Sequence, residues 1–259
     1  MPEFYCRLCN SQVQPIFSSK ILKKYIVTYY HCNNCGFLQT ENPYWLKEAY
    51  YDSINYTDTG ILARNIDNSK IAASLIFFFF NKNAKFLDFA GGFGIFTRLM
   101  RDIGFDFFWS DPYTDNLVAK GFEYSDNSEI ELLTCFECFE HLVNPPEDIE
   151  KMLAISKNIF FTTLLLPNPV PKPDEWWYYG LEHGQHIAFY SKETLQYISQ
   201  KYGLFLYSFG TSHVLTKKRM SPVFFKFVVI FHDIFFHIIK WQRKSRTFAD
   251  MNYLIKKME

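Results

Sequence analysis

The chain has 259 residues, with 27 basic and 27 acidic side chains and a formal net charge of zero. Apolar residues make up 48% and charged residues 21%, which is a globular composition, and the length allows one good-sized domain plus a small module. The lack of net charge argues against nucleic acid as a partner, because binding to phosphates needs clustered Lys and Arg.

The N-terminal sequence MPEFYCRL lacks a basic region followed by an apolar run, so no secretory signal is predicted and a cytoplasmic location is expected. The chain holds six cysteines, arranged as three Cys-x-x-Cys pairs. In a reducing compartment, such pairs indicate metal or redox chemistry rather than structural disulfides.

Residues 1–40 hold two of these pairs, and a β-strand is predicted between them over Lys24–Tyr30. Two residues between cysteines let both sulfurs reach one ion, and four thiolates complete a closed tetrahedral site. We therefore predict a zinc-ribbon module with a structural Zn²⁺, and an iron–sulfur cluster is the main alternative. Its ligands are Cys6, Cys9, Cys32 and Cys35.

The third pair, Cys135 and Cys138, has no second pair nearby in the sequence. It lies where a predicted strand passes into the next segment, so we expect the two sulfurs to diverge. We interpret this pair as coincidental rather than as a redox or metal site.

Residues 41–84 are predicted to form a helical linker or lid, with a helix over Asn68–Asn81. From Lys85 onward, strands alternate with helices, which predicts an α/β fold: a largely parallel, Rossmann-like sheet over residues 85–216 with helices on both faces. The strands are expected over Phe86–Ala90, Phe105–Ser110, Glu129–Phe136, Asn158–Leu166 and Leu204–Thr216, and the helices over Ile95–Ile103, from about Pro145, and over Ser191–Tyr202.

Residues 217–259 are predicted to be an apolar helical extension. The stretch Pro222–Trp241 is strongly apolar, but Lys226, Asp233 and Lys240 argue against a simple membrane span, because charges at mid-bilayer are costly. It is expected to be a packing helix, a dimer helix or an interfacial membrane helix. A homodimer or a peripheral membrane contact through residues 222–246 is therefore expected.

The most informative stretch is a strand that runs into a glycine-rich turn and then a helix, over Phe86–Phe96. Its small residues let a ligand approach the backbone, and the helix N-terminus offers free amide donors. These residues are Ala90, Gly91, Gly92 and Gly94. Asp111 follows the second strand about 20 residues later, where nucleotide-binding α/β folds place a carboxylate for ribose hydroxyls. A dinucleotide-binding dehydrogenase shares this first half of the fold.

At these residues the sequence resembles class I S-adenosylmethionine-dependent methyltransferases. LDFAGGFG is similar to their first motif, with Ala90 in place of the first glycine, and CFECFEHL followed by Asn144 and Pro145 is similar to the segment after their fourth strand. The second similarity favours a methyltransferase over a dehydrogenase, as does the lack of a nicotinamide-type second half. The resemblance implies S-adenosylmethionine as the cofactor, with Asp88 near its amino-acid end, Phe136 along its methionine end and Asp126 near its adenine.

A long loop after the strand at 158–166 combines aromatic residues, glycines and two histidines. Long loops at this edge of a sheet build substrate sites, and Trp or Tyr can stack on a sugar or an aromatic ring. His183 and His186 in this loop, and His141 near the cofactor side, are the candidate general bases, with His186 favoured.

The order of four cysteines, glycine turn and histidine loop resembles zinc-ribbon methyltransferases of sugar and surface-glycan biosynthesis, over residues 1–216. That resemblance implies methyl transfer to a small molecule such as a sugar, a nucleotide sugar or a glycan precursor. Some of these relatives are sugar C-methyltransferases with a further large C-terminal domain, for which this sequence has no room, so the methylated atom stays open. An RNA or protein methyltransferase and a non-catalytic zinc-ribbon binding protein are the alternatives.

Overall fold

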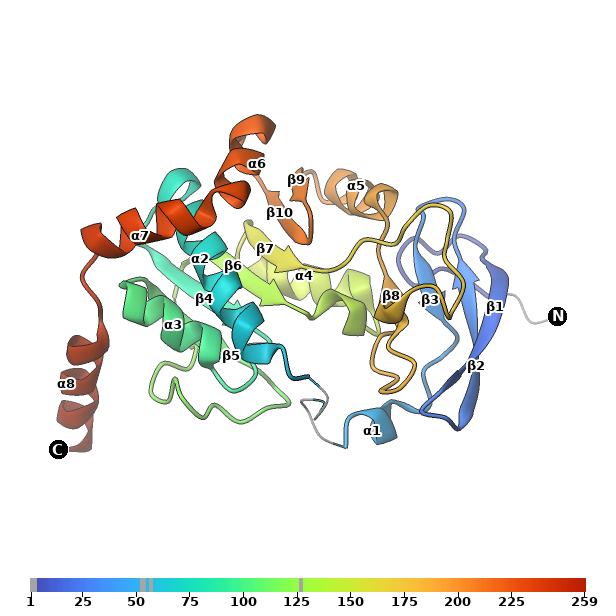
Figure 1. Cartoon of the computed structure of the whole chain (residues 1–259), viewed down its shortest axis with the longest axis horizontal. Helices are drawn as coiled ribbons and strands as arrows, with labels where there is room; N and C mark the ends of the chain where they lie inside the picture. The colour runs from blue at the N-terminus through green and yellow to red at the C-terminus, as the bar shows by residue number, and fades with distance from the viewer. Residues whose placement is uncertain (1–3, 52–54, 56–57, 126–127) are drawn as a thin grey trace.

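The computed structural model describes residues 4–51, 55, 58–125 and 128–259, and it contains two β-sheets (Figure 1). The larger sheet has six strands in the order β5-β4-β6-β7-β10-β9, and the smaller sheet has four in the order β1-β2-β3-β8. The smaller sheet lies at the N-terminal end of the molecule, and the C-terminal helices lie at the opposite end.

The six-stranded sheet consists of β4 (Lys85–Phe89), β5 (Asp106–Ser110), β6 (Ile130–Phe136), β7 (Ile159–Thr162), β9 (Phe205–Phe209) and β10 (Ser212–Thr216). The strands β5, β4, β6 and β7 are parallel, whereas β10 pairs antiparallel with both β7 and β9. This confirms the predicted Rossmann-like, largely parallel sheet.

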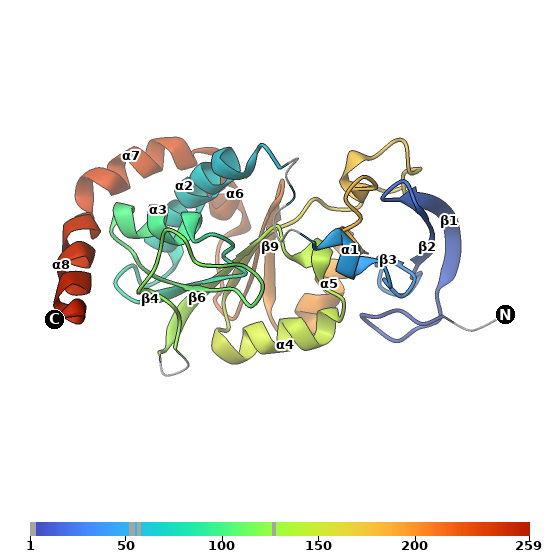
Figure 2. The same ribbon diagram turned by 90° about the horizontal axis from the view of Figure 1, so that it is seen from below.

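Helices cover both faces of this sheet (Figure 2). One face packs against α2 (Ile61–Phe79), α3 (Ile95–Ile103) and α6 (Pro222–Ile230), and the other against α4 (Pro145–Ile155) and α5 (Lys192–Lys201). Successive strand residues alternate between the two cores, as the twofold period of a strand requires: Phe86 and Phe160 face the first core, and Leu87 and Phe161 the second.

The predicted ends of the helices and strands are most accurate where neighbouring residues in the sequence, such as a capping serine, set them. Helix α3 spans the predicted residues, and α5 begins after Ser191, whose side chain forms a capping box with Thr194. Helix α2 starts at Ile61 rather than Asn68, and the strand β7 ends at Thr162 rather than Leu166. The strand stops there because the register of its antiparallel neighbour ends with Ser212 opposite Thr162.

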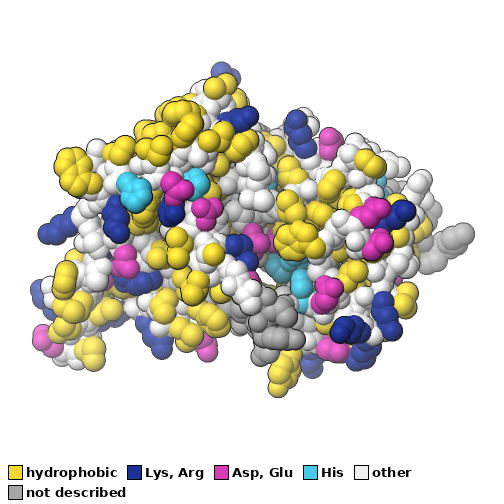
Figure 3. Space-filling model, viewed as in Figure 1, with side chains coloured by type: hydrophobic (Ala, Val, Ile, Leu, Met, Phe, Trp, Pro, Cys, Tyr) yellow, Lys and Arg dark blue, Asp and Glu magenta, His cyan; other side chains and the backbone are white. Residues whose placement is uncertain are grey.

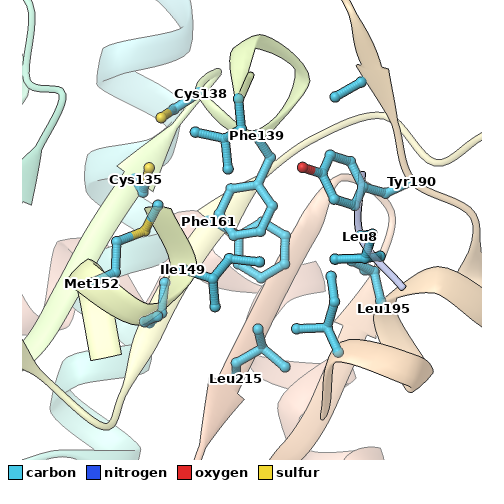
Figure 4. Close-up of a cluster of buried hydrophobic side chains, with 14 of the residues drawn as sticks. Leu8, Cys135, Cys138, Phe139, Ile149, Met152, Phe161, Tyr190, Leu195 and Leu215 are labelled. Carbon is cyan, nitrogen blue, oxygen red and sulfur yellow. The ribbon is translucent and has the colours of Figure 1, made fainter. Parts of the chain in front are cut away.

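The small sheet contains β1 (Gln14–Ile21), β2 (Tyr25–His31), β3 (Leu38–Thr40) and β8 (Ala188–Phe189). Strand β8 belongs to the distant histidine loop, so its pairing with β3 joins the N-terminal module to the main domain. The side chain of Leu8 reaches into the core that contains Phe139, Phe161 and Leu195 (Figure 4). The N-terminal module and the main domain thus share buried apolar surface.

The remaining elements are the short helix α1 (Leu46–Ala49), the 3₁₀ turns η1 (Phe139–His141) and η2 (Trp177–Tyr179), and the C-terminal helices α7 (His232–Gln242) and α8 (Thr247–Met258). Among the described residues, no helix alone has the length and apolar character to cross a bilayer. Helices α6 and α7 together have that length, but they meet at an angle of 80°.

Candidate functional site

A cavity of about 1530 Å³ opens at the carboxyl ends of the parallel strands. Its walls include Phe89, Asp111 and Phe136, which lie at the ends of β4, β5 and β6. The helix α1, the first turns of α2 and the histidine loop close the other sides. Histidine and acidic side chains gather at a hollow in the middle of the face drawn in Figure 3. Single small-molecule sites measure roughly 300–1,000 Å³, so this cavity has room for two ligands.

The glycine turn between β4 and α3 forms one wall of the cavity. Ala90 has a φ of +56°, so it occupies the left-handed conformation that favours the glycine it replaces. A Cβ on Gly91 would lie 2.7 Å from both Asp88 Oδ2 and Trp109 Cδ1, so this position needs glycine. Gly94 does not line the cavity; with a φ of +84° it starts α3 and packs against Ala119.

Asp111 lies at the end of β5, opposite this turn. Its Oδ2 accepts a hydrogen bond from the Gly92 N–H at 2.9 Å, and its Oδ1 accepts from the N–H groups of Tyr113 and Thr114 at 2.8 and 3.0 Å. The amide of Gly92 therefore faces Asp111, although we expected the turn amides to face a ligand. A carboxylate has about four acceptor sites and three are used here, so Asp111 keeps one for a ribose hydroxyl.

Asp88 lies in the floor beneath the turn and is 2% exposed. Burial raises its pKa to about 7, although the Thr97 hydroxyl donates to Oδ2 at 2.9 Å and favours the ionised form. At neutral pH, the site thus holds a carboxyl group that is poised between its two protonation states.

We expect Asp88→Asn to stabilise the ligand-free protein at alkaline pH. Because the folded-state pKa of about 7 exceeds the ordinary aspartate pKa of 3.8, Asp88 lowers the free energy of unfolding as the pH rises between these two values. The full effect, on the order of 4 kcal/mol, is reached above pH 7. Melting curves from pH 4 to pH 8 should therefore separate progressively in favour of the variant, and curves that stay parallel would show that Asp88 is not strained by burial.

Phe136 and Asp126 complete the predicted cofactor residues. Phe136 lines the cavity, and its ring packs edge-on against those of Phe96 and Phe160, at centroid distances of 4.7 and 5.1 Å. Asp126 lies outside the described residues, so its expected place near adenine stays a prediction.

All three candidate histidines line the cavity. The rings of His141 and His186 lie 5.0 Å apart and those of His183 and His186 4.8 Å apart, measured between centroids. Burial lowers the pKa of His141, lowers that of His183 to about 4, and, with the charges of the other two, lowers the pKa of His186 well below its usual value. All three rings are therefore neutral at pH 7.

The hydrogen bonds of these rings identify their free nitrogens. Nδ1 of His186 lies 2.6 Å from the carbonyl oxygen of Tyr178, and Nδ1 of His141 lies 3.1 Å from that of Gln185. A carbonyl only accepts, so both Nδ1 atoms carry the proton and both Nε2 atoms keep a free lone pair. His183 differs, because its Nδ1 accepts from the Gln185 N–H at 3.1 Å. Its protonated Nε2 makes it a poor general base.

Two glutamates next to these histidines were not predicted as site residues. Glu137 lines the cavity just after β6, and its φ of +49° lies in the left-handed region that residues other than glycine rarely adopt; burial raises its pKa to about 7. Glu140 lies under the floor, and burial raises its pKa to about 7 as well. Their position in the segment CFECFEHL, directly after a parallel strand, is the signal that could have identified them.

The aromatic residues of the histidine loop divide into two groups. Trp176, Tyr178 and Tyr179 are buried in the core beneath the small sheet and do not form the expected stacking surface, although Tyr178 reaches the cavity wall. Trp177 is 78% exposed and lines the cavity, and two residues from other segments, Tyr51 and Tyr113, do the same.

The four N-terminal cysteines converge as predicted. Their Sγ atoms all lie within 4.8 Å of one another, with Cys6–Cys35 at 3.6 Å and Cys9–Cys32 at 3.4 Å. Four ligands at ~2.3 Å around a tetrahedral ion are ~3.8 Å apart, so the arrangement fits a Cys₄ metal centre.

Cys135 and Cys138 are both buried, and they lie at the edge of the core drawn in Figure 4. Burial and a hydrogen bond with the Cys138 thiol raise the pKa of Cys135. The expectation that the two sulfurs diverge was therefore wrong, although the raised pKa disfavours the thiolate that redox chemistry needs.

Known proteins share parts of this sequence and of this fold. A family profile described as a methyltransferase domain matches residues 63–208, more than half of the chain. A comparison with curated protein sequences finds no match. Among solved structures, the chain is similar to the plantazolicin methyltransferase BpumL in complex with SAH, at 15% identity and a TM-score of 0.50, over 77% of this chain and 89% of that one. It is also similar to an O-methyltransferase family protein from Burkholderia thailandensis, at 12% identity and a TM-score of 0.49, over 68% of this chain and 63% of that one.

Proposed function

Because the chain belongs to the methyltransferase domain family, it is an S-adenosylmethionine-dependent methyltransferase, and we propose that its acceptor is a sugar or surface-glycan precursor. The observation that carries this proposal is the cavity of about 1530 Å³, in which the glycine turn lines one side and three histidines with Glu137 line the other.

The cofactor side of the cavity fits S-adenosylmethionine. Gly91 and Gly92 leave the wall without side chains, and Asp111 retains acceptor capacity for ribose hydroxyls. Phe136 offers an apolar surface for the methionine end. When bound, this cofactor supplies a methyl group that is already activated on a sulfonium. The chain's own task is to align the acceptor with that group and to exclude water.

The acceptor side has the properties of a sugar site. Its rim carries the exposed rings of Tyr51, Tyr113 and Trp177, and flat rings stack on the apolar faces of sugars. Its floor presents the free Nε2 lone pairs of His141 and His186, next to which an acceptor hydroxyl can lose its proton. His183, which the sequence also suggested as a base, is left as a hydrogen-bond donor.

We assign the four N-terminal cysteines to a structural Zn²⁺. A closed Cys₄ site leaves no position for a substrate or for water, so its role is to hold the fold. Module and catalytic domain are in close contact, because a Cβ on Gly36 would lie 2.5 Å from Ser191 Oγ.

Two apolar stripes on the C-terminal helices support a peripheral contact with an anionic membrane rather than a dimer. Each stripe repeats at i, i+4 and i+7 on an exposed face, and the yellow surface at the upper left of Figure 3 covers these helices. The stripes are Val223, Phe227 and Ile230 on α6, and Ile234, Ile238 and Trp241 on α7.

The charged residues next to the two apolar stripes also favour an anionic membrane as the partner. Asp233 is the only acidic residue between Pro222 and Arg246, and it is paired with Lys70 at 2.7 Å. Lys240 and Lys244 are exposed beside Trp241, which is 86% exposed. Lysines with an interfacial tryptophan are typical of helices on anionic bilayers, whereas protein interfaces are depleted in lysine. A lipid-linked glycan precursor would be presented at such a surface.

The proposal predicts that tritium from methyl-labelled S-adenosylmethionine enters a polyprenyl-linked sugar in anionic vesicles. The double variant Phe227→Glu/Ile234→Glu should lower this labelling at least ~10-fold and leave the labelling of a soluble nucleotide sugar unchanged, because only docking is lost. Ile26→Glu, which changes an exposed isoleucine on β2, is the matched control. Label in RNA or peptide instead would refute the acceptor class, and equal labelling by the double variant would refute the membrane contact.

A further inference from the structure

The carboxyl group of Glu140 is buried without a partner. The residue is 0% exposed, and neither Oε1 nor Oε2 has a hydrogen-bond partner among the described residues. The hydroxyls of Thr163 and Tyr178 lie nearby and favour its ionised form, but they also bond to each other at 3.1 Å, which leaves one hydroxyl proton for two carboxyl oxygens. A buried carboxylate that lacks partners is costly, and proteins keep such groups mainly where a counter-charge or a metal satisfies them.

The two histidines that approach Glu140 are oriented like metal ligands. Each directs its Nδ1–H at a backbone carbonyl, His186 at Tyr178 and His141 at Gln185. The Tyr50 hydroxyl, 2.8 Å from Nδ1 of His141, adds to the fixation of that ring. Histidine ligands almost always donate their second N–H in this way, which fixes the tautomer and presents the other nitrogen to the ion.

We propose that Glu140, His141 and His186 bind a divalent transition-metal cation at the floor of the acceptor side. One ligand atom from each of the three lies within 4.8 Å of the others, and all three side chains are at least partly buried. Two imidazoles and one carboxylate on a single face are a donor set that suits Mn²⁺, Fe²⁺, Co²⁺ or Zn²⁺ and leaves coordination positions open. This site is separate from the Cys₄ centre.

The catalytic role of this metal site rests on the proposed function. In that role, His141 and His186 hold the cation instead of taking the proton of the acceptor hydroxyl themselves. His141 and His186 line the cavity, whereas Glu140 holds the ion from below. A cation there would bind the acceptor oxygen and make its O–H bond more acidic. The proton then leaves to solvent, the oxygen lone pair forms the new O–C bond, and the C–S bond breaks to give the neutral thioether of S-adenosylhomocysteine.

The experiment is a calorimetric titration with Mn²⁺ of protein treated with a chelator. Mn²⁺ suits oxygen and nitrogen donors and not the soft thiolates of the ribbon, so it reports on the new site. The wild type should bind one Mn²⁺ per chain, and Glu140→Gln and His186→Ala should each bind it at least ~100-fold more weakly. His237→Ala, which removes an exposed histidine on α7, is the matched control and should bind as the wild type does.

Thermal melting gives a second readout that does not depend on activity. Glu140→Gln removes the unpartnered charge, so without metal this variant should melt at or above the wild-type temperature, and Mn²⁺ should raise the melting temperature of the wild type alone. No Mn²⁺ binding by the wild type, or equal binding by Glu140→Gln, would overturn the site. Binding of S-adenosylmethionine, measured on the same samples, tests the proposed function separately and should stay within about threefold in both variants.

Discussion

Replacing Asp111 by alanine is expected to weaken the binding of S-adenosylmethionine at least ~100-fold. The variant loses the carboxylate that we assign to the ribose hydroxyls. It also loses the hydrogen bond from the Gly92 N–H, which joins the end of β5 to the glycine turn, and two bonds from the N–H groups of Tyr113 and Thr114, which shape the segment just after β5. The variant therefore affects both the contact of the carboxylate with the ribose and the shape of the glycine turn. Titration calorimetry measures the combined effect of the two on cofactor affinity.

Asp115→Ala is the control for this variant, because it removes an exposed aspartate from the same segment. Its affinity should match that of the wild type. If Asp111→Ala bound the cofactor as tightly as the control, the carboxylate at the end of β5 would have no part in cofactor recognition, and the assignment of this wall of the cavity would fail.

Replacing Cys32 by serine is expected to reduce methyl transfer at least ~10-fold while the affinity for S-adenosylmethionine stays within about threefold. The reason is that the ribbon supports the histidine loop and not the glycine turn. Strand β3 pairs with β8, which begins two residues after His186. Arg7 Nη2 donates to the Ile187 carbonyl at 2.6 Å, and Trp45 Nε1 donates to that of Gly184 at 2.8 Å.

Turnover and cofactor affinity, measured on the same preparation, separate this account from general unfolding. Asn33→Ala changes an exposed residue between the two cysteines of the second pair and should leave both quantities unchanged. A joint loss of turnover and cofactor binding in Cys32→Ser would mean that the ribbon holds the whole domain together. Unchanged turnover would mean that the metal centre has no link to the acceptor side.

The features that could be predicted from the sequence are those determined by residues close to one another along the chain. The helix over Ile95–Ile103 follows a glycine turn and ends at Gly104, which has a φ of +109°, so its limits are encoded next to it in the chain. Ser191 likewise marks the start of α5. The glycine turn, Asp111 and the two cysteine pairs were found for the same reason, because spacing along the chain reflects the geometry of each site.

Features that depend on contacts between segments far apart in the sequence were not predicted. Strand β1 (QPIFSSKI) lacks a regular apolar alternation and exists through its pairing with β2. Trp176 and Tyr179 became core residues because the small sheet covers them. Glu137 and Glu140 gained importance only when the loop around His186 folded back over the end of β6. Contacts between segments that are far apart in the sequence decide these outcomes, and a single sequence does not record them.

The central claim is that the wall formed by the β4–α3 turn and Asp111 binds S-adenosylmethionine. Titration calorimetry of the wild type tests it most directly. We predict saturable binding of one cofactor molecule per chain, which S-adenosylhomocysteine displaces by competition for the same wall. A titration without heat of binding, or binding that S-adenosylhomocysteine does not displace, would contradict the claim.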